Sequence, residues 1–167
     1  MIPAFIPFRQ RAKAKLSAEE GSALVELGIS LPLLLVILLG GAEFARVAYA
    51  SIEVVNSAHA AAVYAASGQS AVSDSGGITN AANSDAQNLA GTSGITVTSV
   101  TTSCTCADTT FAPSSCSDNS TCNSNNTSMV TAVTVQTQST FSPLIHLPGS
   151  PSTFTLHGQS TEVVSNQ

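Results

Sequence analysis

The sequence predicts an α+β protein in which one long N-terminal helix packs on a small antiparallel sheet. An uncharged, leucine-rich run over residues 27–42, followed by helical spacing of small apolar residues, indicates the helix. Three later segments, residues 95–103, 129–141 and 153–164, alternate valine and other apolar residues with threonine, serine and glutamine, which is typical of strands. We expect a short second helix and a cysteine-rich loop to complete the domain.

Charged residues are scarce and unevenly distributed. They make up 9% of the 167 residues, against roughly 25% in typical soluble domains. Four of the five basic residues lie within the first fifteen positions, and there is no lysine or arginine after Arg46. A surface that binds nucleic acid needs basic side chains to displace counterions, so we expect no nucleic-acid partner.

The apolar run predicts a transmembrane helix over residues 22–42. A helix of this length rises about 30 Å, the thickness of the hydrocarbon core of a bilayer. Glu26 is the one charge within it. Because the basic residues precede the run, the positive-inside rule places the N-terminus in the cytoplasm and the C-terminal domain outside it. Pro32 removes one backbone hydrogen bond and predicts a helix kink, which neighbouring groups can compensate in a membrane.

Gly21 and Glu26 predict a processing site at the cytoplasmic end of this helix. Cleavage after Gly21 would give Ser22 a free ammonium group, one helical turn from the carboxylate of Glu26. The two charges attract strongly in a low-dielectric setting, within one helix or between neighbouring helices. A glycine before the cleaved bond has no side chain to clash in a peptidase cleft.

Together with the basic leader and the adjacent apolar span, these residues resemble the class III prepilin-type cleavage signal of type IV pilins and pseudopilins. The chain also resembles the TadE-like family of the tight-adherence (Flp) pilus system. The GSALVEL opening, Pro32, Glu43-Phe44 with Arg46, and the alanine-rich segment 56–66 carry this resemblance. Residues 129–164 add a weaker match.

The resemblance implies a minor pseudopilin with a pilin-like fold that takes part in assembly of a type IV pilus after cleavage by a prepilin peptidase. The implied partners are that peptidase, other pilin or pseudopilin subunits, the bacterial inner membrane and the pilus assembly platform. Two alternative functions do not depend on this resemblance. One is a single-pass envelope protein that presents a small binding domain without entering a pilus. The other is a secreted adhesion domain, released by signal cleavage at Ala48-Tyr49-Ala50.

The expected organisation has four parts. Residues 1–21 form the cytoplasmic leader, 22–42 the transmembrane helix, 43–67 its extracytoplasmic extension and 68–167 a small α+β domain. Apolar residues of the extension fall near one helical seam. They are Phe44, Val47, Val54, Ala58, Ala61 and Ala65. We expect Glu43 and Arg46, one turn apart, to form an exposed ion pair.

The first part of the extracytoplasmic domain is predicted to contain a loop and a short helix. The composition of residues 67–79, which is rich in serine and glycine, predicts a flexible loop. Residues 80–90 then place Ala82, Ala86, Leu89 and Ala90 on one face of a short helix.

Cys104, Cys106, Cys116 and Cys122 predict two disulfides rather than a zinc site. Their gaps of one, nine and five residues differ from the paired spacings of zinc ligands, and disulfides persist outside the cytoplasm. Bridging Cys104 to Cys106 is awkward along a strand. Two pairings stay open: Cys104–Cys116 with Cys106–Cys122, or Cys104–Cys122 with Cys106–Cys116.

The sequence predicts no catalytic activity, cofactor or metal. His59, His146 and His157 are scattered over a predicted helix, loop and strand, and none lies in a motif with a nucleophile. The chain has no phosphate-binding loop, dinucleotide fingerprint or zinc-peptidase motif. We expect this chain to be the substrate of an enzyme.

Overall fold

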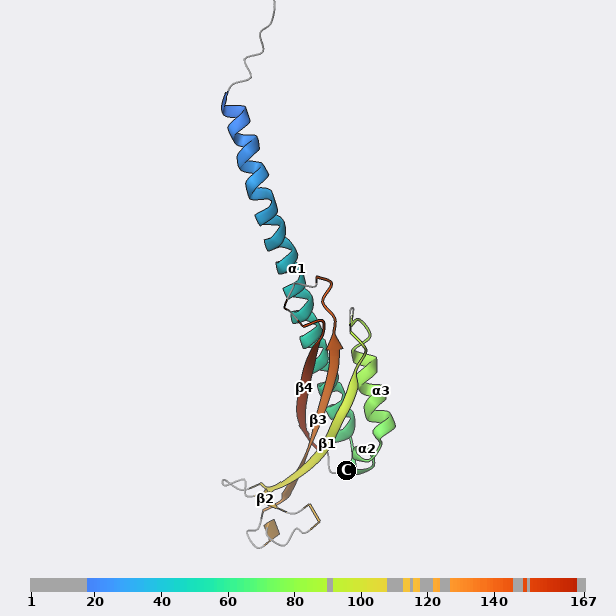
Figure 1. Cartoon of the computed structure of the whole chain (residues 1–167). Helices are drawn as coiled ribbons and strands as arrows, with labels where there is room; N and C mark the ends of the chain where they lie inside the picture. The colour runs from blue at the N-terminus through green and yellow to red at the C-terminus, as the bar shows by residue number, and fades with distance from the viewer. Residues whose placement is uncertain are drawn as a thin grey trace, which may run out of the picture. The chain divides into compact units, whose positions relative to one another are not determined.

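The computed structural model describes residues 18–89, 92–107, 113–114, 116–117, 122–123, 127–145, 149 and 151–164 (Figure 1). Its elements are α1 (Ala18–Ala66), α2 (Gln69–Val72), α3 (Ser75–Asp85), β1 (Thr96–Cys106), β2 (Pro113–Ser114), β3 (Met129–Phe141) and β4 (Phe154–Val163). The chain divides into two compact units, Met1–Gly41 and Ala42–Gln167. The α+β class, the long N-terminal helix and the small antiparallel sheet are confirmed.

The described part of the first unit is a segment of α1 whose large apolar side chains are exposed. These are Leu24, Val25, Leu27, Ile29, Leu31, Leu33, Leu34, Leu35, Val36, Ile37, Leu38 and Leu39. Over Gly21–Ala66, α1 is long and apolar enough to span a membrane, and it is the one such helix in the described part of the chain. It runs through Pro32.

The second unit is built on a sheet with strand order β2-β1-β3-β4, in which all neighbours are antiparallel. The β1–β3 ladder runs from Thr96 opposite Gln138 to Cys106 opposite Met129, with one register shift after Val97. The β3–β4 ladder is unshifted over ten pairs. The three predicted strands are therefore present, and the two-residue β2 adds to β1.

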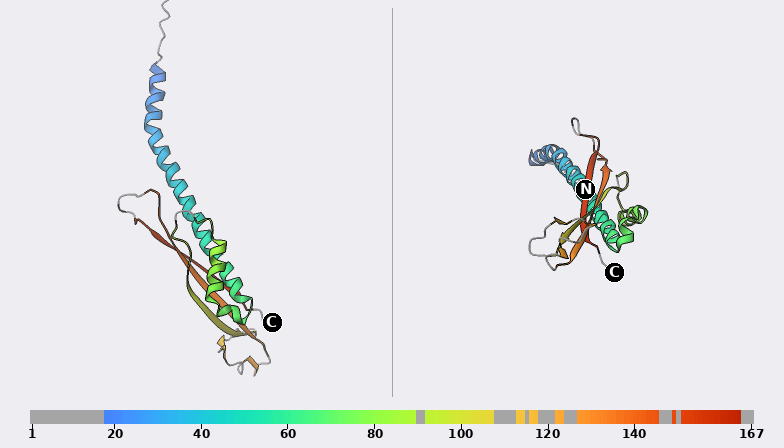
Figure 2. Two further views of the ribbon diagram at one scale, coloured as in Figure 1. Left: turned by 90° about the vertical axis from the view of Figure 1, so that its right-hand side faces the viewer. Right: turned by 90° about the horizontal axis from the view of Figure 1, so that it is seen from below.

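The helices of the second unit cover one face of this sheet (Figure 2). Alternate residues of β3 are buried, because successive side chains of a strand point to opposite faces. These are Thr131, Val133, Val135, Thr137, Ser139 and Phe141. Small residues of α1 are buried with them and permit close packing. They are Ala58, Ala61, Ala62, Ala65 and Ala66, next to Val54.

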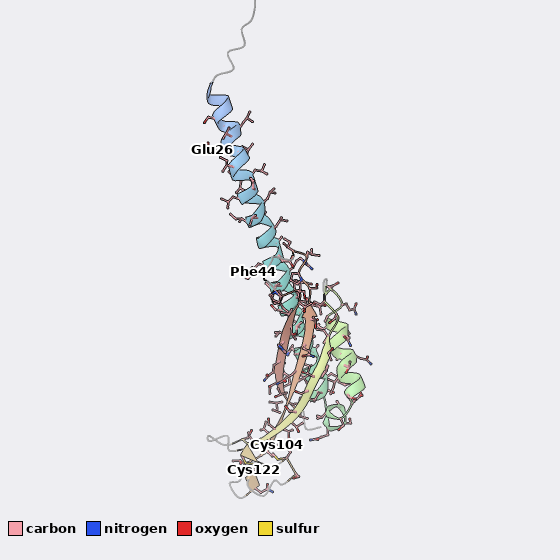
Figure 3. All side chains as sticks on the ribbon, in the orientation of Figure 1. Glu26, Phe44, Cys104 and Cys122 are labelled. Atoms are coloured by element: carbon pink, nitrogen blue, oxygen red, sulfur yellow. A yellow bond between two sulfur atoms is a disulfide. The ribbon has the colours of Figure 1, made fainter. Side chains whose placement is uncertain are left out.

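Two predictions about the helices are wrong in detail. The second helix, α3, begins at Ser75 and ends at Asp85, so it starts within the predicted loop, which also contains α2. The side chain of Asp74 explains this start, since it caps α3 by accepting a hydrogen bond of 2.9 Å from the Gly77 amide. Phe44, predicted on the packed seam of α1, is 76% exposed (Figure 3).

Candidate functional site

The predicted cleavage site lies within α1. Because the helix begins at Ala18, the peptide bond between Gly21 and Ser22 is helical. A Cβ atom placed on Gly21 would meet nothing within 4 Å. Packing inside the described chain therefore does not require a glycine at this position, and a requirement for one would come from a partner.

Glu26 lies one helical turn after Ser22, and both side chains are exposed (Figure 3 labels Glu26). In a helix, residues four apart share a face, so the structure brings these two predicted site residues together. Among the residues that the structure describes, no ion pair involves Glu26.

Pro32, the predicted kink residue, sits among the exposed apolar side chains of the first unit. Proline has no amide hydrogen, so the carbonyl of Gly28 lacks its usual helical donor. Two residues before Pro32, the hydroxyl of Ser30 donates to the carbonyl of Leu27 over 3.3 Å. Large contiguous apolar surface of this kind is stable in contact with lipid or with other protein chains.

A second charged cluster lies at the start of the second unit. The predicted pair is confirmed: Arg46 Nη1 lies 2.9 Å and 3.0 Å from the two carboxylate oxygens of Glu43. The pair is not simply exposed, because the guanidinium also stacks 5.2 Å from the ring centroid of Phe141. Glu43 Oε1 in addition accepts a hydrogen bond of 3.0 Å from the Leu144 amide. The cluster thus joins α1 to the end of β3, a contact that the local spacing did not reveal.

The backbone of α1 contacts the sheet at the carbonyl oxygen of Val54. This oxygen accepts hydrogen bonds of 2.8 Å from the Thr137 hydroxyl of β3 and from the Ser57 hydroxyl. Gly158 of β4 is next to this oxygen, and a Cβ atom added to Gly158 would collide with the Val54 carbonyl. A glycine inside a strand is the sequence signal for such an approach.

The disulfides are Cys104–Cys116 and Cys106–Cys122, the first of the two pairings left open by the sequence. Cys104 and Cys106 lie at the C-terminal end of β1, where they pair with Thr131 and Met129 of β3. The two bridges therefore attach the segment after β1 to the end of the sheet.

Asp74 links α1 to the α2–α3 turn. The hydroxyl of Tyr64 donates to Asp74 Oδ2 over 2.6 Å, while Asp74 Oδ1 accepts from Gly77. The hydrogen bond from Tyr64 and the one from the Gly77 amide lower the pKa of Asp74 below its ordinary value. The same carboxylate raises the pKa of Tyr64.

The histidines do not form a catalytic arrangement in the described part of the chain. His59 of α1 lies 3.1 Å from Glu162 and 3.4 Å from the Ser160 hydroxyl, both on β4. His157 is exposed on the same strand, and His146 lies outside the described residues. Both contacts are made by the same ring nitrogen, Nδ1, whereas a Ser-His-acid triad uses one ring nitrogen for the serine and the other for the acid.

Comparison with known proteins finds a match for the N-terminal part of the chain. Residues 21–63 match the family model of TadE-like proteins. No curated protein and no solved structure matches the chain. The match begins at Gly21 and contains Ser22, Glu26, Pro32 and the Glu43–Arg46 pair. Residues 21–63 are therefore similar to TadE-like proteins.

Proposed function

We propose that the chain is a minor pseudopilin that takes part in assembly of a tight-adherence (Flp) type IV pilus after a prepilin peptidase cleaves it behind Gly21. The observation that carries the proposal is the spacing of Gly21, Ser22 and Glu26 at the start of the TadE-like match. All three are exposed on one helix segment. A peptidase can reach this segment, and none of the three is held by contacts within the described chain.

The proposed cleavage would place a positive charge at Ser22, next to the negative charge of Glu26. A carboxylate within a membrane helix costs about 2.5–3.5 kcal/mol on insertion scales when it lies near the centre, and Glu26, near the cytoplasmic end of the proposed span, costs less. Cleavage creates an ammonium at Ser22 one turn from Glu26, which offsets this cost. A cation on one subunit can equally pair with Glu26 of the next. The charge pair thus favours both retention in the membrane and alignment of neighbouring subunits.

The exposed apolar surface of residues 24–39 supports a helix that passes from lipid to a protein environment. In the bilayer, lipid tails cover these side chains, whereas in a filament the helices of other pilin subunits would cover them. Membrane, assembly platform and neighbouring subunits are accordingly its proposed partners.

The proposed orientation has a cytoplasmic N-terminus and an extracytoplasmic domain in the bacterial envelope. The basic leader supports the cytoplasmic end. The two disulfides support the other end, since disulfides persist in oxidising compartments such as the periplasm. The four proposed parts are the leader to residue 21, the span 22–42, the extension 43–67 and the domain 68–167.

A pair of glycine variants tests the cleavage site. Gly21 and Gly28 lie on the same helix, and a Cβ would meet nothing within 4 Å at either position. With the prepilin peptidase co-expressed, Gly21→Val is expected to keep its full mass, while wild-type chain and Gly28→Val lose the leader. Equal processing of both variants would contradict cleavage behind Gly21.

A further inference from the structure

The two disulfides differ in their exposure to solvent. Cys106 and Cys122 are both 0% exposed. In the other bridge Cys104 is 4% exposed, but Cys116 is exposed to solvent. A thiol that attacks a disulfide must reach one sulfur, so Cys116 offers an approach that the Cys106–Cys122 bridge does not.

Cys116 also lines a surface groove between α2 and the sheet. The other lining residues are Gln69, Val72, Ser73, Thr102, Met129 and Thr131. Thiol oxidoreductases approach their targets with an exposed sulfur, and the groove supplies space next to Cys116 for such an approach. The described lining residues carry no charge, so none of them repels an approaching thiolate.

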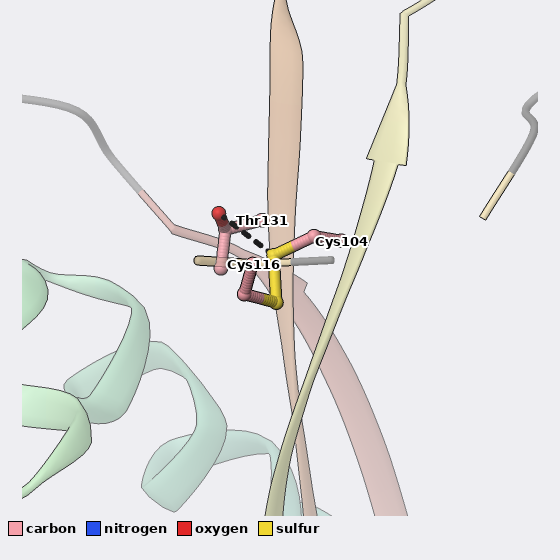
Figure 4. Close-up of a disulfide and its surroundings, with 3 residues drawn as sticks. All are labelled: Cys104, Cys116 and Thr131. Carbon is pink, nitrogen blue, oxygen red and sulfur yellow. Dashed lines mark hydrogen bonds between the residues drawn. A yellow bond between two sulfur atoms is a disulfide. The ribbon is translucent and has the colours of Figure 1, made fainter. Parts of the chain in front are cut away.

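Thr131 makes the two sulfurs of this bridge unequal. Its hydroxyl oxygen lies 3.4 Å from Cys104 Sγ (Figure 4). A disulfide sulfur has no hydrogen, so the threonine is the donor. When the bridge opens by attack at Cys116, Cys104 leaves as a thiolate, and the hydroxyl stabilises that negative charge. A leaving thiolate of lower pKa leaves faster.

We propose that Cys104–Cys116 is a thiol–disulfide exchange site for a dithiol oxidoreductase, whereas Cys106–Cys122 is a structural bridge. The partner's thiolate attacks Cys116 Sγ, forms a mixed disulfide and expels Cys104 as a thiolate. The partner's second thiol then displaces Cys116. The partner is oxidised to a disulfide, and Cys104 and Cys116 are reduced to two thiols. In the reverse direction the same steps form the bridge.

Exchange at this site acts on the short edge strand of the sheet. Ser114 of β2, two residues before Cys116, pairs with Cys104 of β1. Opening the bridge removes the covalent support of β2, while Cys106–Cys122 still closes the segment after β1. The inference does not rest on the pilus function, because it concerns the chemistry of the bridges alone.

Timed reduction of the full chain in detergent tests the proposal. Aliquots taken during treatment with dithiothreitol are quenched with N-ethylmaleimide, and tandem mass spectrometry locates the labels. We expect Cys104 and Cys116 to be labelled together, about tenfold faster than the other pair. Equal rates, or earlier labelling of Cys106 and Cys122, would overturn the proposal.

Two variants at Thr131 and one trapping experiment test the direction of attack. Thr131→Val is expected to slow opening of Cys104–Cys116 several-fold and to leave the buried bridge unchanged, and Thr131→Ser is expected to restore the rate. Equal changes at both bridges would contradict a local role of the hydroxyl.

A dithiol oxidoreductase whose second cysteine is replaced by serine should be trapped on Cys116; trapping on Cys104 would refute the mechanism.

Discussion

Thr137 and Gly158 pair with each other in the β3–β4 ladder, and together they accommodate the backbone of α1 at Val54. The hydroxyl of Thr137 donates over 2.8 Å to the carbonyl of Val54, and Gly158 leaves the space that this carbonyl occupies. The hydrogen bond of Thr137 and the absence of a side chain at Gly158 thus allow the backbone of α1 to pack close to the sheet.

Gly158→Ala is therefore expected to destabilise the second unit. The new methyl group would collide with the Val54 carbonyl, which is backbone and cannot rotate away. Overpacking of this kind costs about 1–3 kcal/mol. Chemical denaturation followed by circular dichroism measures the loss. Gly68→Ala is the control, because a Cβ at Gly68 meets nothing within 4 Å. An equal loss of stability in both variants would contradict the contact between Gly158 and the Val54 carbonyl.

Arg46→Met tests the cluster at the start of the second unit. The substitution keeps an apolar stem but removes the ion pair with Glu43 and the charge above Phe141. Partly exposed ion pairs and cation–π contacts each contribute about 0.5–1 kcal/mol, so a loss of about 1 kcal/mol is expected. Repeating the substitution in a Phe141→Leu background should give a smaller loss. Additive losses would show that Arg46 and Phe141 act independently.

Acid is expected to weaken the junction between α1 and the α2–α3 turn. The pKa of Asp74 is lowered in the folded chain, mainly by the hydrogen bond from Tyr64. Such a carboxyl stabilises the fold above its unfolded pKa of about 4, and the contribution is lost as the pH falls through the folded pKa. Melting temperatures of wild type and Tyr64→Phe should therefore differ at pH 7 and converge in strong acid. A difference that does not change with pH would contradict this linkage.

Glu26→Gln tests the charge pair of the proposed pseudopilin. The peptidase site at Gly21 is unchanged, so we expect normal processing. Assembly should fall strongly because the ammonium of Ser22 loses its partner. Pilus counts by electron microscopy and the processed fraction by mass measure the two effects. Glu53→Gln is the control, since Glu53 lies on the same helix outside the apolar run. Normal pilus numbers in Glu26→Gln would contradict a role for the charge.

Local patterns predict the elements of this fold better than its contacts. The alternation of Val133 and Val135 with polar residues marks β3, because side chains of a strand alternate between faces. The start of α3 was missed because Gly76 and Gly77 suggest a loop, whereas the cap of Asp74 favours a helix. The glycine signal at position 158 did not identify its partner, since Val54 is brought there only by tertiary folding.

The candidate site shows the same division. Gly21 and Glu26 can be proposed from the sequence because the chemistry proposed for them depends on spacing within one helix. The disulfide pairing stayed open because the two alternatives close loops of similar length, and only the register of the sheet decides between them. The contact of Thr131 with Cys104 depends on the same register and had no local signal.

The mass of the N-terminal peptide of the protein purified from its native host tests the central claim most directly. Cleavage behind Gly21 predicts a chain that begins at Ser22 and retains Glu26 as its fifth residue. A chain that still begins at Met1, or one that begins after the Ala48-Tyr49-Ala50 segment, would contradict the pseudopilin account.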